Sequence, residues 1–112
     1  MKMIVYAGGE YTTGDQIAQA LMEYSRALAE EEAAQNVDIP IVHEDGSVGT
    51  ATFLIGPSSQ IVAEAIESDH EELVDSETVE RLRSMMRSLH PTAITEQRSE
   101  EDARQRWADD EI

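Results

Sequence analysis

The sequence predicts a small α+β domain in which an antiparallel sheet carries two helices on one face. Three observations lead to this fold class. The length of 112 residues fits one domain with a modest core. Two segments repeat their apolar residues with the period of a helix, and four others are rich in strand-forming residues. These segments follow one another in the order β-α-β-β-β-α, which predicts a sheet of about four strands.

The first strand is expected over residues 2–7 and ends at Gly8-Gly9. The following helix is predicted to begin at Thr13, which forms a capping-box pattern with Gln16. It is predicted to end at Asn36, because asparagine readily adopts the left-handed conformation that terminates helices. Four apolar residues at i, i+4, i+7 and i+11 mark its buried face: Ile17, Leu21, Tyr24 and Leu28.

Residues 37–55 are predicted to form a β-hairpin. Alternate residues of its first strand share one face, namely Val37, Ile39, Ile41 and His43. Asp45-Gly46 suits the positive φ angles of a type I′ turn, and the return strand covers residues 48–55. Because Pro40 cannot donate to a ladder, its strand is expected at a sheet edge or with the proline nitrogen facing outward.

Residues 60–66 are compatible with either a strand or a short helix. The dipeptide Ile61-Val62 favours a strand, whereas Ala63-Glu64-Ala65 favours a helix. Gly56-Pro57 breaks the chain just before this segment. We expect a third antiparallel strand at this position.

A second helix is predicted to follow the polar loop at residues 69–72. Asp75 is placed to cap it, and Val74 is placed to form a hydrophobic staple with Val79. Its apolar residues again form one stripe: Val79, Leu82, Met86 and Leu89. His90-Pro91 ends the helix, so the domain is expected to cover residues 1–91.

Residues 92–112 are predicted to form a polar tail, either mobile or docking. Ala103 and Trp107 would share one face if this segment were helical. A single tryptophan on a charged tail can anchor a partner, because aromatic side chains dominate binding hot spots. It can also make no contact, or dock on its own domain or on a second copy of the chain. The candidate partner-docking residues are therefore Trp107, Ala103 and Ile94.

The net charge of −16 is concentrated in the first part of the chain. Residues 1–80 hold 17 acidic residues against Lys2 and Arg26 alone. Such a protein is repelled by nucleic acid and anionic lipid and is attracted to cationic partners. Solubility in the cytosol is the simpler explanation. A small basic cluster follows, Arg81, Arg83 and Arg87. Glu77 is spaced to pair with Arg81, and Glu80 is spaced to pair with Arg83.

The composition excludes several kinds of site. The chain has no cysteine, which removes disulfides, thiolate metal sites and cysteine nucleophiles. No apolar run has the length of a signal-peptide core or of a membrane span, so a cytoplasmic location without membrane contact is expected. Ser58 and Ser59 lack the glycine pattern of a nucleophile elbow and are explained by a turn.

Two further patterns have some features of binding sites. The segment from Gly8 to Gly14 precedes a helix and could hold an anion, but the phosphate-binding and dinucleotide-binding patterns are missing. His43 and His70 lie among carboxylates, which is suitable for a metal, but they and His90 lack helical metal-site spacing. We therefore predict no catalytic residue, no metal ligand and no cofactor.

Charge and an anchor-like tail favour a non-enzymatic accessory or interaction protein. Its partner would be another protein, a basic one for instance, or a second copy of the chain. A small enzyme or ligand-binding domain is the alternative, and a pocket lined by His43 or Tyr24 between sheet and helices would indicate it. A nucleic-acid-mimicking inhibitor of a basic partner is a third candidate, which regular rows of carboxylates would indicate.

Overall fold

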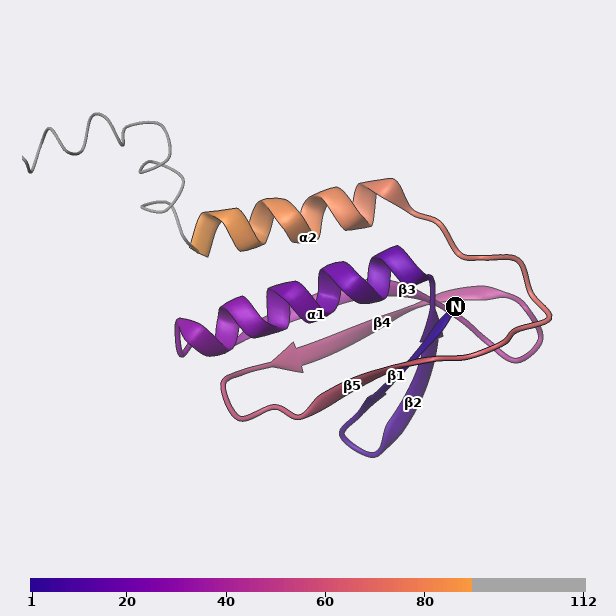
Figure 1. The fold of residues 1–112 in the computed structure, drawn as a ribbon, viewed down its shortest axis with the longest axis horizontal. Coiled ribbons are helices and arrows are strands. Elements are labelled where there is room, and N and C mark those ends of the chain that lie inside the picture. The colour runs from indigo at the N-terminus through magenta and orange to yellow at the C-terminus, as the bar shows by residue number, and fades with distance from the viewer. Residues whose placement is uncertain (90–112) are drawn as a thin grey trace, which may run out of the picture.

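The structure, a computed structural model, describes residues 1–89, which form five strands and two helices (Figure 1). The elements are β1 (Lys2–Tyr6), β2 (Gly9–Thr13), α1 (Asp15–Glu30), β3 (Gln35–Val42), β4 (Val48–Ile55), β5 (Ile61–Ala65) and α2 (Ser76–Leu89). All strand pairs are antiparallel, in the order β4-β3-β2-β1-β5. The α+β class, the predicted order and the strand at residues 60–66 are confirmed, but the sheet has five strands instead of four.

The additional strand is β2, in a segment where a strand-to-helix turn was expected. Ala7 and Gly8 have φ angles of 52° and 84°. Two positive φ angles in succession are the signature of a type I′ turn, which joins antiparallel strands directly. The chain therefore reverses at once, and Tyr6 pairs with Gly9. The prediction that Gly8-Gly9 leads straight into a helix was wrong.

The predicted capping box of the first helix was also wrong. Thr13 is the last residue of β2, and its hydroxyl donates to the carbonyl of Pro40 at 2.8 Å. Gly14 takes the N-cap position and offers no side chain for capping. The carboxylate of Glu72 replaces it, because its Oε2 accepts the backbone N–H of Asp15 at 2.5 Å. The start of α1 is thus completed by a distant loop.

The helix α1 ends earlier than predicted. The N–H of Ala33 donates to the carbonyl of Leu28 at 3.0 Å, and that of Glu32 donates to Ala29 at 3.1 Å. This pair of bonds is the Schellman motif, in which the residue after the C-cap is left-handed. Glu32 has that conformation, with a φ of 55°. Asn36, the predicted terminator, lies in β3.

The hairpin of β3 and β4 is present, but its turn differs from the predicted type I′. Val42 pairs with Val48, and the His43 N–H donates to the Ser47 carbonyl at 2.8 Å. Three residues therefore form the loop, and among them only Gly46 has a positive φ, of 90°. This geometry is a type I turn followed by a left-handed glycine.

Pro40 lies in the interior strand β3, between β4 and β2. The ladder between β2 and β3 consists of the single pair Thr12 and Val42. The Pro40 carbonyl faces β2, since it accepts from Thr13, and the nitrogen of a strand residue points the same way as its carbonyl. The proline nitrogen therefore faces β2, on the side of β3 where almost no ladder is needed. The expected position at a sheet edge was wrong, because β3 is an interior strand.

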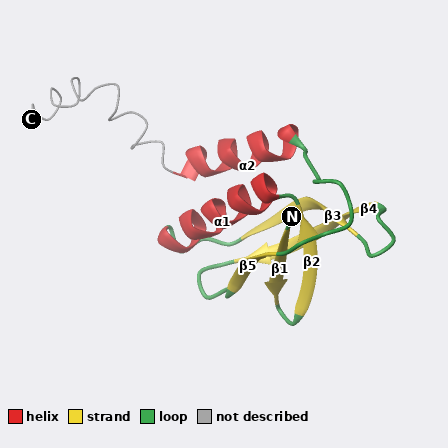
Figure 2. Cartoon of the chain, turned by 45° about the vertical axis from the view of Figure 1, so that its right-hand side comes forward, coloured by secondary structure: helices red, strands yellow, loops and turns green. Residues whose placement is uncertain are grey.

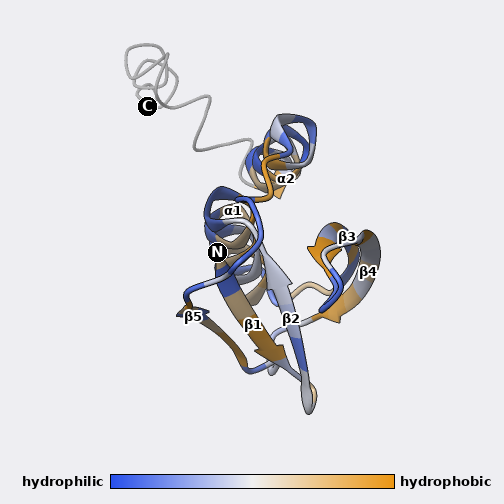
Figure 3. Ribbon diagram, turned by 90° about the vertical axis from the view of Figure 1, so that its right-hand side faces the viewer, coloured by the Kyte–Doolittle hydropathy of each residue, from blue (hydrophilic) through white to orange (hydrophobic). Residues whose placement is uncertain are grey.

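The two helices lie on the same side of the sheet (Figure 2). In the end view of Figure 3, the sheet bends between β2 and β3, α1 lies over it, and α2 lies farther out. Contacts of α2 are chiefly with α1. The predicted stripe of α1 is confirmed, since Ile17, Leu21, Tyr24 and Leu28 are at most 2% exposed. They face buried residues of the sheet: Ile4, Val37, Ile39, Phe53 and Ile55.

The start of α2 confirms the predicted cap. The Asp75 carboxylate accepts the Thr78 hydroxyl at 2.9 Å and the Thr78 N–H at 3.2 Å. These hydrogen bonds lower the pKa of Asp75. Val74 is 76% exposed, so the predicted staple with Val79 buries little surface. Leu82 is fully buried, which fixes the helix on the domain.

Neither helix among residues 1–89 combines the length and the apolar character needed to cross a bilayer.

Candidate functional site

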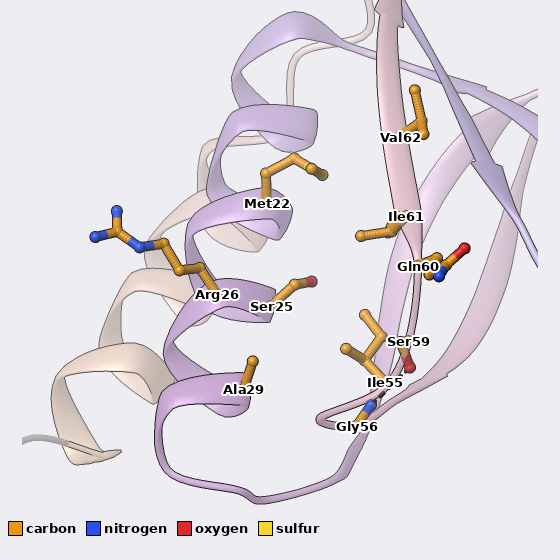
Figure 4. A pocket seen from close by; sticks show the side chains of 10 residues that line it. All are labelled: Met22, Ser25, Arg26, Ala29, Ile55, Gly56, Ser59, Gln60, Ile61 and Val62. Carbon is orange, nitrogen blue, oxygen red and sulfur yellow. Dashed lines mark hydrogen bonds between the residues drawn. The ribbon is translucent and has the colours of Figure 1, made fainter.

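A groove runs between α1 and β5, at one edge of the sheet (Figure 4). The hollow at this place has a volume of about 420 Å³. Met22, Ser25 and Ala29 project into it from α1, and Ile61 projects back from β5. Ile55, at the end of β4, closes its base. We call this hollow and its continuation along the helix the α1–β5 groove.

The groove continues along the first half of α1. A second hollow of about 500 Å³ shares Met22 with the first and lies between Ala18 and Ala63. On the helix, Ala18, Met22, Ser25 and Ala29 recur at i, i+4, i+7 and i+11, so they form one face. Three of these four side chains are small, which leaves open space between the helix and the strand.

One wall of the groove is an edge strand. Among residues 1–89, β5 pairs with β1 alone, so its other edge presents backbone N–H and C=O groups. Its side chains alternate between the two faces of the sheet. Ile61 faces the helix, whereas Val62, the next residue, is 55% exposed. The edge is therefore accessible beside the groove.

Polar groups on the helix wall serve the helix itself. The Ser25 hydroxyl donates to the Leu21 carbonyl at 2.8 Å. Arg26 is 82% exposed, pairs with Glu30 at 3.3 Å and points away from the strand (Figure 4). The first hollow is thus an apolar surface with Arg26 at its rim, and the continuation is flanked by one cation and one anion, Lys2 and Asp15.

Ser59, on the strand wall, belongs to a chain of hydrogen bonds that closes the end of the sheet. Its Oγ accepts the Gly56 N–H at 2.9 Å and lies 3.0 Å from the Tyr6 hydroxyl. The Tyr6 hydroxyl donates to the Leu54 carbonyl, so Ser59 is the donor to Tyr6. This serine therefore has a turn-forming role, as the sequence predicted.

The residues that would have indicated an enzymatic pocket lie away from the groove. Tyr24 is 2% exposed in the core, and this burial raises the pKa of its hydroxyl. His43 lies exposed at the β3–β4 turn, with its ring over Gly49. The two side chains do not meet in a common pocket.

The second histidine of the described chain holds a loop in place. The His70 ring lies against Gly46, and its Nε2 is 3.2 Å from the Glu44 carbonyl oxygen. The loop before α2 is thereby docked on the β3–β4 turn. Within residues 1–89, no three histidine or carboxylate side chains gather closely enough to hold a metal ion.

The carboxylate of Glu72 occupies the start of α1, where the sequence pattern suggested an anion site. Besides capping α1, Glu72 accepts from the Met1 amino group at 2.9 Å. Asp15 lies 3.0 Å from the same amino group. Hydrogen bonds to Glu72 and Asp15 raise the pKa of this amino group. An external anion would meet two carboxylates here.

The arginines of α2 have structural partners other than those predicted from helical spacing. Arg81 donates to the Asp38 carbonyl in β3. The Nε of Arg83 lies 3.9 Å from a carboxylate oxygen of Glu23 in α1. Both arginines therefore fasten α2 to the rest of the domain. Arg87 pairs with Glu80 at 3.2 Å.

The predicted docking residues Ile94, Ala103 and Trp107 lie outside the described residues. The groove itself was missed at the level of sequence. A signal was present, because the second, small-residue stripe of α1 is visible in the sequence. Its meaning depends on which strand faces it, and only the sheet order supplies that.

No protein-family model matches the chain, and comparisons with curated proteins and with solved structures find no similar protein. The groove and the sheet edge are therefore the features that indicate a function.

Proposed function

We propose that this chain is a cytoplasmic, non-enzymatic interaction protein that binds an extended segment of a protein partner in the α1–β5 groove. The observation that carries the proposal is an apolar groove open beside an unpaired strand edge. Edges of this kind bind peptides by strand addition, in which backbone hydrogen bonds give affinity and side-chain pockets give specificity.

An added strand would find space on both faces of β5. Side chains on the helix side would enter the groove between Ile61 and the small residues of α1. Those on the other side would lie beside Val62, where a shallow hollow of about 540 Å³ also contacts Val5 and Tyr6. Both hollows are largely apolar. The partner segment is therefore expected to be rich in apolar, strand-forming residues.

The charge of the domain favours a cationic partner. The formal net charge is −16, and the charged residues that line the groove are Arg26, Lys2 and Asp15. The attraction of a cationic partner therefore comes from the acidic domain as a whole. A field of this sign speeds the approach of cationic chains and slows that of anionic ones. The partner segment is accordingly an apolar strand flanked by lysine or arginine.

Peptide selection tests the proposal. The immobilised 112-residue chain is exposed to a displayed library of random peptides of about ten residues, the length of a long strand. Enriched peptides are expected to alternate apolar residues and to carry basic flanks. Their affinities for the chain are then measured in solution by calorimetry.

A matched pair of variants assigns the binding site. Ala29→Phe fills the groove from the exposed side of α1 and is expected to weaken binding about tenfold or more. Gln16→Phe adds the same ring to α1 outside the groove and is expected to leave binding unchanged. A library that yields no enriched peptide, or peptides that bind both variants equally, contradicts the proposal.

A further inference from the structure

We propose that the opposite sheet edge, strand β4, joins two copies of this chain into a symmetric dimer. In this dimer the two β4 strands pair antiparallel with each other and continue the sheet across both copies. The proposal concerns the outer edge of β4 from Val48 to Leu54, whereas the α1–β5 groove touches β4 only at its last residue, Ile55.

The strand β4 lacks the features that normally protect a sheet edge. Natural edges are kept short or carry charges, proline or bulges that prevent pairing with other chains. In contrast, β4 has eight residues, Val48–Ile55, without a charge or a proline, in a chain of which 29% is charged. Val48 is 59% exposed and Leu54 is 63% exposed. They are two of the four large hydrophobic residues exposed in residues 1–89.

The hydrogen-bonding pattern shows which backbone groups the edge offers. Pro40 directs its carbonyl away from β4, since that carbonyl accepts from Thr13. Its cross-strand partner Thr50 must then direct its N–H and C=O away from β3, because directly opposed antiparallel residues either share both bonds or neither. The hydrogen bond from the His43 N–H to the Ser47 carbonyl gives the same alternation of bonded and non-bonded residue pairs along β3 and β4. The open edge thus offers the backbone groups of Thr50 and of the residues two positions away.

The side chains of β4 are arranged symmetrically about Ala51. Thr50 and Thr52 lie one residue to either side, and Val48 and Leu54 lie three residues to either side. Antiparallel self-pairing centred on Ala51 therefore places Val48 of each copy opposite Leu54 of the other copy, so this apolar pair forms twice. It also places Thr50 opposite the partner's Thr52. Apolar pairs and threonine pairs across strands are both stabilising.

Charge selects a second copy as the occupant of this edge. The strand has no charge of its own, and the neighbouring Asp38 carboxylate already accepts the Thr52 hydroxyl at 2.6 Å, whereas self-pairing brings no charged strand residues together. Repulsion between the two acidic domains acts at longer range, and physiological salt screens it beyond about 8 Å. The Leu54 carbonyl already accepts from Tyr6, so the central threonine pairs supply the main backbone bonds.

The mass of the 112-residue chain in solution tests the proposal, measured by sedimentation over a range of concentrations in about 0.15 M sodium chloride. Twice the mass of one chain is expected at high concentration. Val48→Lys and Leu54→Glu are each expected to weaken dimerisation about tenfold or more, because each variant places an unpaired charge against an apolar residue in both of the symmetric pairs. Both positions are exposed, so circular dichroism is expected to show an unchanged fold.

The double variant Val48→Lys, Leu54→Glu is expected to restore the dimer, because the two new charges face each other across the interface. The two positions lie at opposite ends of β4, so this rescue can only act between chains. Val62→Lys, on the exposed face of β5, is the control and is expected to leave the dimer intact. A monomer at every concentration overturns the proposal. So does a dimer that tolerates Val48→Lys, dissociates with Val62→Lys, or is not restored by the double variant.

Discussion

Two residues of the domain hold a backbone conformation that side chains disfavour. Ala7 and Glu32 are the non-glycine residues with positive φ among residues 1–89. Each costs about 1–2 kcal/mol relative to a residue in the ordinary helical region. Ala7 is fixed by the tight β1–β2 turn, and Glu32 is fixed by the Schellman motif that ends α1. The surrounding hydrogen bonds therefore outweigh the local preference at both positions.

Glu32→Gly is expected to stabilise the domain by about 1 kcal/mol, because glycine adopts the left-handed conformation without strain. The substitution also removes a negative charge from the C-terminal end of a helix dipole, where anions are unfavourable. Glu32→Gln removes the charge but keeps the strain, so it is expected to give only a few tenths of a kcal/mol. Urea unfolding of both variants provides the comparison. A glycine variant that is less stable than the glutamine variant would show that Glu32 is not strained.

Elements whose pattern is local could be predicted from the sequence, and elements decided by distant partners could not. The stripe from Ile17 to Leu28 identifies α1 because its periodicity needs no knowledge of the sheet. Thr13, by contrast, suits a helix cap and a strand equally well. Its strand role depends on Pro40, 27 residues away, and the cap of α1 comes from Glu72, 57 residues from the Asp15 N–H that donates to it. The groove was missed for the same reason, since it exists only where α1 meets β5.

The cap of α2 provides a pH-dependent prediction for one element. The pKa of Asp75 is lowered in the folded protein by its bonds from Thr78, so the cap contributes stability above the unfolded pKa of about 3.9. That contribution is lost as the pH falls through the lower, folded pKa. Asp75→Ala is expected to cost about 0.5–2 kcal/mol at neutral pH.

Urea unfolding as a function of pH checks this assignment. The deficit of Asp75→Ala relative to the original chain is expected to shrink as the pH falls below about 4, because the original cap is then protonated. Asp75→Asn keeps a neutral acceptor for the Thr78 bonds, so its small deficit is expected to vary much less with pH. If the stability deficit of Asp75→Ala stays constant as the pH falls, the Asp75 carboxylate is not the stabilising group.

At the scale of the whole molecule, the two sheet edges differ in character. The β5 edge lies beside a groove in a strongly acidic domain, which suits a cationic partner strand. The β4 edge is uncharged and symmetric, which suits a second copy. Because the edges are separated by three intervening strands, one dimer could bind two partner strands at once. Under the two proposals the acidic charge discriminates between partners, while the dimer interface on β4 is neutral.

The same charge predicts how salt affects folding. Residues 1–89 contain 17 acidic and five basic residues, so repulsion among carboxylates outweighs attraction. The side-chain ion pairs, such as Arg26 with Glu30, are largely exposed and contribute at most about 1 kcal/mol each. Raising sodium chloride from about 0.01 to 0.15 M shortens the screening length from about 30 to 8 Å, which weakens the many repulsions more than the few attractions. The melting temperature is therefore expected to rise.

The measurement uses the Val48→Lys variant, because salt-promoted dimerisation would otherwise raise the melting temperature further. Sodium chloride is used because sulfate also strengthens the burial of apolar surface. A melting temperature that falls steadily with sodium chloride would show that the ion pairs around α1 and α2 dominate the electrostatics of the fold.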